Sequence, residues 1–108
     1  MIKKVIKIHL DNDTRMIVIF QREKKQILNF VVVLEARGKI VNIGKDEWIQ
    51  VLRIDTAHGY PHMDKLDKEG NKIDIVKFDY LNNEEALTLA IDSLKKTYKE
   101  FIKSFIAS

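Results

Sequence analysis

The chain has 108 residues, a formal net charge of +3 and no cysteine, and 45% of its residues are apolar while 32% are charged. These values indicate one soluble globular domain over residues 1–108, and they exclude a disordered chain and a disulfide framework. The apolar runs are too short to span a membrane, and no apolar signal segment follows Lys4. We therefore expect a cytoplasmic protein with no membrane partner, and the mild positive charge permits a polyanionic partner without requiring one.

The sequence of the first half of the chain is typical of β-strands joined by short turns. Apolar–polar alternation and β-branched runs predict strands at residues 2–10, 14–21, 26–36, 39–43 and 47–55. Asn, Asp, Gly and charged residues separate these strands and predict turns. The second and third strands are apolar on both faces, which is unusual for a sheet that is covered on one side.

The second half predicts a hairpin and then a helix. Strands at 62–67 and 72–80 flank a turn in which Gly70 is free to take a positive φ. Asn82 or Asn83 caps a helix over 84–105, and one face of this helix carries an apolar stripe, namely Leu87, Ala90, Ile91, Leu94, Tyr98, Phe101, Ile102 and Phe105. The fold class is therefore α+β, with an antiparallel β-meander of about five to six strands followed by one long C-terminal helix packed on one sheet face.

Titratable residues gather in one stretch, 53–64, which interrupts the strand pattern. Arg53 and Asp55 lie two apart on a strand and face the same way. His58 and His62 flank Gly59 and Pro61, so they belong to a loop rather than to a regular helix. A rigid scaffold presents functional side chains on such loops, and we take this stretch as the candidate site.

Two chemistries fit these residue types. In metal-free phosphodiester cleavage, His58 and His62 act as base and acid, Arg53 holds the phosphate, and Asp55 fixes the tautomer of His58. In the metal version, His58, His62, Asp55 and Asp64 supply nitrogen and oxygen ligands for zinc, manganese or iron. The spacing matches no metal signature, so we rank the metal version second and expect no cofactor and no tightly held ion. A third interpretation is structural, with Arg53 and Asp55 closing the end of a sheet.

A resemblance enters at these residues. The pattern Arg53-x-Asp55-Thr56-x-His58-Gly59-x-x-His62 resembles the R-Y-D-(T/N)-x-H-G-x-x-H signature of small prokaryotic proteins, with Ile54 at the Tyr position. It is similar, more loosely, to a segment of TumE-type toxins of toxin–antitoxin systems. The resemblance covers ten to twelve residues and the strand-then-helix layout. It implies that Arg53, Asp55, His58 and His62 form the site, that the protein is an RNA-directed toxin, and that an antitoxin protein is a partner.

The alternative function is a non-enzymatic module that binds protein or nucleic acid, in which the stretch from Arg53 to His62 is structural. A salt-dependent affinity for RNA or DNA without turnover would favour this alternative. Trp48 is expected to be a strand core residue rather than a platform for stacking bases. The helix lysines are most simply a solvated face.

The doubly apolar strands also predict self-association. One helix covers one face, which leaves the face of Ile17, Ile19, Ile27, Val31 and Val33 opposite that of Val18, Phe20, Phe30, Val32 and Leu34. An apolar patch of that size is rare on soluble monomers. We therefore predict a homodimer built on the second and third strands or on an overhanging helix end near Phe105.

Overall fold

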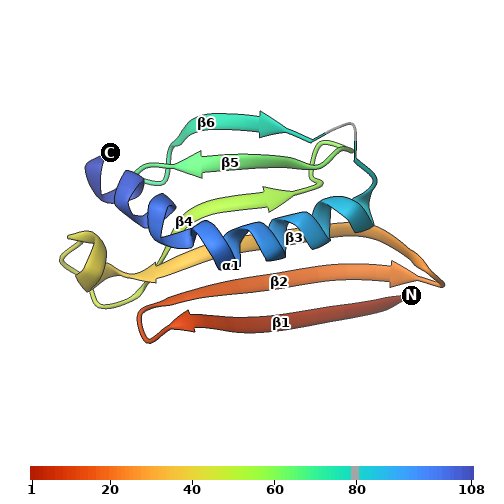
Figure 1. Cartoon of the computed structure of the whole chain (residues 1–108), viewed down its shortest axis with the longest axis horizontal. Helices are drawn as coiled ribbons and strands as arrows, with labels where there is room; N and C mark the ends of the chain where they lie inside the picture. Colours follow the sequence, from red (N-terminus) through yellow and green to blue (C-terminus); the bar gives the residue numbers. More distant parts are fainter. Residues whose placement is uncertain (79–80) are drawn as a thin grey trace.

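The computed structural model describes residues 1–78 and 81–108 of the chain. Six antiparallel strands form one sheet in chain order, and a single long helix follows them (Figure 1). The strands and helices are β1 (Ile2–Asp11), β2 (Thr14–Glu23), β3 (Gln26–Arg37), η1 (Gly38–Val41), β4 (Trp48–Asp55), β5 (His62–Leu66), β6 (Lys72–Lys77) and α1 (Asn83–Ala107). The predicted α+β meander with one C-terminal helix is confirmed.

One predicted strand is wrong. Residues 39–43 were expected to form a short strand, but Gly38–Val41 is a 3₁₀ helix that ends at Asn42 in the left-handed region, with φ 61°. Gly38 fits there because a Cβ at this position would collide with the backbone oxygen of Lys45. The hairpin between β5 and β6 is confirmed, with Gly70 at φ 84°, and the predicted end of its second strand at Tyr80 lies outside the described residues.

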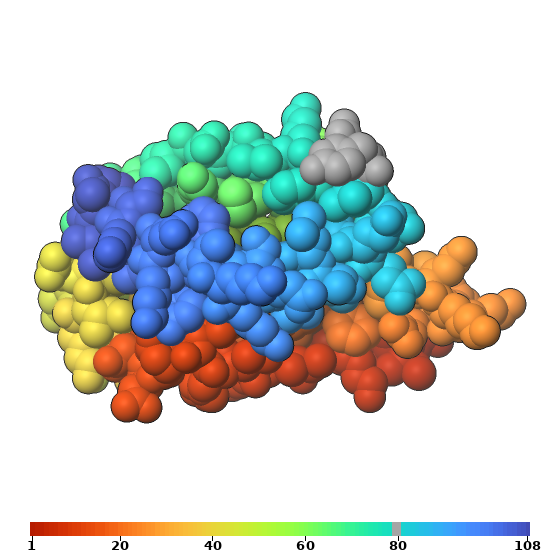
Figure 2. Space-filling model, viewed as in Figure 1, coloured from red at the N-terminus to blue at the C-terminus, as the bar shows by residue number. Residues whose placement is uncertain are grey.

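Helix α1 begins with a capping box. The Asn82 side chain accepts a hydrogen bond from the backbone N–H of Glu85, and the Glu85 side chain accepts one from the backbone N–H of Asn82. From this cap the helix runs across β3 and also contacts β4 and η1, so that it covers the middle of the sheet (Figure 2). The predicted stripe lies against the core, and Leu94 and Phe105 are almost fully buried. Phe105 is therefore part of the core and not an overhanging helix end, and the version of the predicted dimer that uses it stays a prediction without support from this side chain.

The core lies between α1 and one face of the sheet. A row of paired residues runs through its centre, namely Val18, Val32, Ile54, Met63 and Val76. Alternation along the strands places Met16, Phe30, Leu34 and Leu52 on the same face, where all four are buried. The dry contact between this face and the apolar stripe of α1 holds the two layers together.

A β-bulge corrects the predicted face of one residue. Gln21 pairs with Asn29 and Arg22 with Ile27, so Leu28 is the extra residue of β3. The extra residue reverses the alternation of side chains at this point. Ile27 therefore faces the core, although alternation alone places it on the opposite face, and Leu28 is exposed. The Asn83 side chain donates to the carbonyl oxygens of both Ile27 and Leu28, which joins the bulge to the start of α1.

The other face of the sheet, which we call the open face, is covered by no helix of the residues that the structure describes. Its central row pairs Ile19, Val31, Asp55, His62 and Lys77, and the next row pairs Ile17, Val33, Arg53, Asp64 and Ile75. The apolar residues of this face thus lie mainly on β2 and β3, with Val5 on β1 and Ile75 on β6, and charged residues occupy the same rows on β4 and β5. Over the described ranges, no helix is long and apolar enough to cross a membrane.

Candidate functional site

The candidate site is a square of four side chains on the open face of β4 and β5. Arg53 and Asp55 lie two apart on β4, as predicted, and His62 and Asp64 lie two apart on β5. The strand register pairs Arg53 with Asp64 and Asp55 with His62. Side chains paired across antiparallel strands lie close together, so this register alone brings the four groups into contact range.

The loop between β4 and β5 is fixed by hydrogen bonds of its backbone and of two side chains. Thr56 bonds to Phe30 of β3 through both its backbone and its hydroxyl group. The Gly59 N–H donates to the Thr56 carbonyl, and Gly59 takes φ 82°, which glycine adopts without a steric penalty. The Ala57 N–H donates to Asp55 Oδ1 at 3.0 Å. These contacts hold the histidine-bearing loop against the edge of the square.

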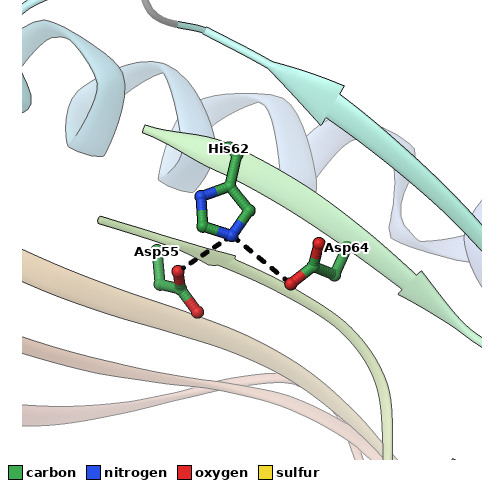
Figure 3. Close-up of side chains that lie close together, drawn as sticks. All are labelled: Asp55, His62 and Asp64. Carbon is green, nitrogen blue, oxygen red and sulfur yellow. Dashed lines mark ion pairs between the residues drawn. The ribbon is translucent and has the colours of Figure 1, made fainter. Parts of the chain in front are cut away.

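The imidazole of His62 lies between two carboxylates (Figure 3). Its Nε2 is 3.2 Å from Asp55 Oδ1 and 3.4 Å from Asp64 Oδ2. Its Nδ1 is 3.2 Å from the carbonyl oxygen of Tyr60. The three side chains of Asp55, His62 and Asp64 are all buried, and His62 is only 2% exposed. Every nitrogen of this ring is therefore engaged by oxygen atoms of its own chain.

This arrangement corrects two predicted roles. Asp55 contacts His62 and not His58, so it does not fix the tautomer of His58. His62 is buried with both ring nitrogens occupied, so it is poorly placed to exchange a proton with a substrate. His58 is exposed, and its ring centroid lies 5.0 Å from that of His62. The two histidines converge, as the metal-free chemistry requires, but only His58 faces solvent.

Two cations approach the carboxylates. Arg53 Nε is 3.6 Å from Asp55 Oδ2, and Lys72 Nζ is 3.3 Å from Asp64 Oδ2. Within the described residues, Arg53 Nε and Asp64 Oδ1 are buried without a hydrogen-bond partner. Buried polar atoms of this kind are rare in folded proteins, and each calls for a ligand, a water molecule or an ion. The site is therefore charge-balanced but incompletely bonded.

Aromatic rings form the rim of the site. Tyr60 lies 5.7 Å from His62 and 6.4 Å from His58, measured between ring centroids. Lys77, from the neighbouring strand β6, lies with its Nζ 5.5 Å from the centre of the Tyr60 ring. The rim thus combines one exposed imidazole with a cation and a phenol ring around the buried cluster.

A second group on the open face surrounds Trp48. The guanidinium carbons of Arg15 and Arg37 lie 4.0 and 4.7 Å from the centre of its ring, and the His9 ring lies 6.4 Å away. Trp48 pairs with Arg37 across β3 and β4. It is only half-buried and lies outside the core cluster of the described residues, so the expectation of a core residue is wrong.

Sequence reasoning missed Lys72, Tyr60 and the arginines around Trp48. Lys72 directly follows the predicted hairpin turn. The pairing of the two hairpin strands would have indicated that its side chain lies near Asp64. Arg37 and Trp48 required the register of β3 against β4, which the wrongly predicted strand between them concealed. Tyr60 is part of the motif stretch, and its contact with Lys77 depends on the path of the loop.

Comparison with known proteins shows the family to which the chain belongs. The model of a family described as a domain of unknown function (DUF7718) matches residues 1–108, so the chain belongs to this family. Neither the search of curated proteins nor the search of solved structures found a match. The family description names no activity, and the geometry of the open face carries the functional argument.

Proposed function

We propose that this member of the DUF7718 family is a nucleic-acid-directed protein that binds single-stranded RNA along its open face. One observation carries the proposal: lysine or arginine side chains occur on the open face of five of the six strands, beside two half-buried aromatic rings. Lys7 lies on β1, Arg15 on β2, Arg37 on β3, Arg53 on β4, and Lys72 and Lys77 on β6, while β5 carries His62.

The shape of the open face favours a single strand over a duplex. Six strands spaced about 4.8 Å apart form a face about 24 Å wide, and single-stranded RNA is commonly bound on such a sheet with its bases splayed. Guanidinium groups bind phosphate in a bidentate manner, and the Trp48 ring orients those of Arg15 and Arg37. Tyr60 offers an aromatic surface near the other end of β4.

Binding is best tested with two matched charge reversals. Lys7→Glu with Lys77→Glu alters the open face, whereas Lys95→Glu with Lys96→Glu alters exposed lysines of α1. Each double variant reverses two charges and takes the formal net charge from +3 to −1. Fluorescence anisotropy with labelled single-stranded RNA, single-stranded DNA and duplex DNA measures the affinity of each.

We expect the open-face variant to lose at least about 10-fold in affinity for single-stranded RNA, and the helix variant to lose less than about 3-fold. Tighter binding of single-stranded DNA would change the identity of the ligand but not the binding face. Equal losses in the two variants would show only the effect of net charge and would contradict the proposal. A preference for duplex DNA would contradict it as well.

Phosphodiester cleavage is the second candidate function. It is favoured by the exposed imidazole of His58 next to the buried His62 and by Arg53, which borders the same cluster. In this version the protein is a TumE-like toxin with an antitoxin partner, and His58 exchanges the proton while Arg53 holds the phosphate. Expression should arrest growth, and His58→Ala should relieve the arrest. RNA binding without turnover, unaffected by His58→Ala, would leave the binding module in which the motif is structural.

The homodimer through β2 and β3 stays a prediction. Ile17, Ile19 and Val31 are only partly buried, which favours it, but Lys7 and Arg15 lie beside them and long side-chain stems shield apolar surface. Sedimentation velocity at micromolar concentration tests it. A dimer that dissociates when RNA is added would show that the dimer and the RNA use the same face, and a monomer throughout would remove the predicted dimer.

A further inference from the structure

We propose that Asp55, His62 and Asp64 form a binding site for one divalent transition-metal cation. One ligand atom from each residue lies within 4.8 Å of the other two, and all three residues are buried. A set of one imidazole and two carboxylates suits zinc or manganese. The residues come from two adjacent strands rather than from a mobile loop, so the site is held by the sheet itself.

The hydrogen-bond inventory of His62 supports a cation at its Nε2. A carbonyl oxygen only accepts, so Nδ1, which faces the Tyr60 carbonyl, carries the hydrogen. In the neutral ring, Nε2 then presents a lone pair toward two carboxylate oxygens. Either a second proton or a metal ion must occupy that position. An Nδ1–H bonded to a backbone carbonyl is also the usual support of a histidine that binds metal through Nε2.

The distances favour a metal ion over a proton between these groups. Charge-assisted N–H···O bonds are about 2.7–2.9 Å long, whereas the two contacts of Nε2 measure 3.2 and 3.4 Å. Two ligands about 2.0–2.1 Å from a tetrahedral ion lie about 3.3 Å apart. The spacing of His62 from both carboxylates is therefore that of ligands around a common ion.

Asp64 provides a second and independent observation. Its Oδ1 is buried and has no hydrogen-bond partner among the described residues, and the residue as a whole is 2% exposed. A carboxylate oxygen in that position loses its hydration without compensation. A cation that binds this carboxylate through both of its oxygens would give Oδ1 the partner that it lacks.

Lys72 acts as the competitor of the ion. Its Nζ lies 3.3 Å from Asp64 Oδ2, and with Arg53 it balances the two carboxylate charges when no ion is bound. The Lys72 side chain is 52% exposed, so it is free to swing into solvent when a cation arrives. The Lys72 ammonium group and the divalent ion thus compete for the same carboxylate. Removal of the Lys72 ammonium group should therefore tighten metal binding.

As a cofactor for phosphodiester chemistry the ion rests on the proposed function, but the binding of the ion does not. Metal binding is therefore measured on the full chain without nucleic acid, after treatment with chelator, by calorimetric titration with zinc chloride and with manganese chloride. Asp64→Asn removes a ligand charge, and Asp74→Asn is the matched control. Asp74 lies on the adjacent strand and pairs with Lys65 outside the cluster.

We expect one equivalent of zinc or manganese to bind the parent chain and the Asp74→Asn control with equal affinity. Asp64→Asn should weaken binding at least about 10-fold, and Lys72→Met should strengthen it several-fold. Lys72 is exposed, so this second variant is expected to fold even where Asp64→Asn does not. No stoichiometric binding by the parent, equal weakening in both Asp variants, or an unchanged affinity in Lys72→Met would each overturn the metal site.

Discussion

The two faces of this sheet are built from the same strands and differ in almost every physical property. On the face under α1, the row from Val18 through Ile54 to Val76 is apolar on each strand. One residue further along, the row on the open face begins with Ile19 and ends with Asp55, His62 and Lys77. Because side chains alternate along a strand, neighbouring residues belong to an apolar face that stabilises the fold and to a face that carries charged and titratable groups.

Side chains of this molecule are buried in two different ways. Leu34 and Leu52 are buried because α1 packs on them. Asp55, His62 and Asp64 are just as buried without a helix above them, in a cluster of ion pairs with Arg53 and Lys72. Buried charges are costly unless they are paired, so this cluster is a candidate for function rather than for stability alone.

The largest effect is expected at the bulge, where the two faces exchange residues. Ile27→Ala removes a core side chain and should lower the free energy of unfolding by about 2–4 kcal/mol. Leu28→Ala, the neighbouring change on an exposed residue, should cost less than about 1 kcal/mol. Urea denaturation of both variants checks the pair. Equal losses would mean that the bulge does not set which residue faces α1.

A matched pair of valines compares the faces directly. Val32→Ala opens a cavity under α1 and should cost about 2 kcal/mol, since two buried methyl groups are lost. Val31→Ala alters the same residue type on the open face, where the side chain is only partly buried, and should cost less than about 1 kcal/mol. The ratio of the two losses, from the same denaturation experiment, measures how far α1 dominates stability. A larger loss at Val31 would indicate a covered open face, as in the predicted dimer.

The next largest loss of stability is expected from a change in the capping box at the start of α1. Asn82→Ala leaves the Glu85 N–H without its acceptor and should destabilise the chain by about 1 kcal/mol. Thermal unfolding followed by circular dichroism measures the loss. Thr88→Ala, at an exposed position within the same helix, is the control and should be close to neutral. A neutral result for Asn82→Ala would show that packing alone fixes the start of α1.

The smallest effect is a pH dependence at the β5–β6 turn. The hydrogen bond from the Asn71 backbone N–H lowers the pKa of Asp67, and a similar bond from Glu69 acts in the same direction. A carboxyl group with a lowered folded-state pKa contributes stability above its unfolded pKa of about 3.9 and loses it as the pH falls through the folded value. Asp67→Ala should therefore be less stable than the parent at pH 7, and the gap should close near pH 2. A gap that stays constant between these pH values would contradict this assignment.

The sequence predicted the fold far better than the site. Short turns and one apolar helix stripe were enough for the meander and for the face that α1 covers. The motif stretch also named Arg53, Asp55, His58 and His62, which the structure brings close together; whether they form a functional site stays a prediction. The partner of each residue depended on strand register, which no local pattern provides, and so Asp55 was assigned to His58 instead of His62.

Two further errors have a physical cause in local geometry. The segment 39–43 contains β-branched residues, but the chain must turn tightly between β3 and β4, and it does so through η1 and the left-handed Asn42. Trp48 is a large apolar residue of the kind usually found in a core. The bulge between Leu34 and Glu35 and its position at the end of the sheet place it on the open face beside Arg15 and Arg37. In both places backbone geometry overrides the side-chain preference.

The most direct test of the open face as the binding face uses Trp48, the one tryptophan of the chain. Its emission should change in a saturable manner as unlabelled single-stranded RNA is added, because in the proposed complex the nucleic acid contacts the arginines that lie on its ring. The midpoint should match the affinity from anisotropy and shift in the Lys7→Glu, Lys77→Glu variant but not in the Lys95→Glu, Lys96→Glu variant. Binding detected by anisotropy with no change in Trp48 emission, or a shift only in the helix variant, would contradict the account.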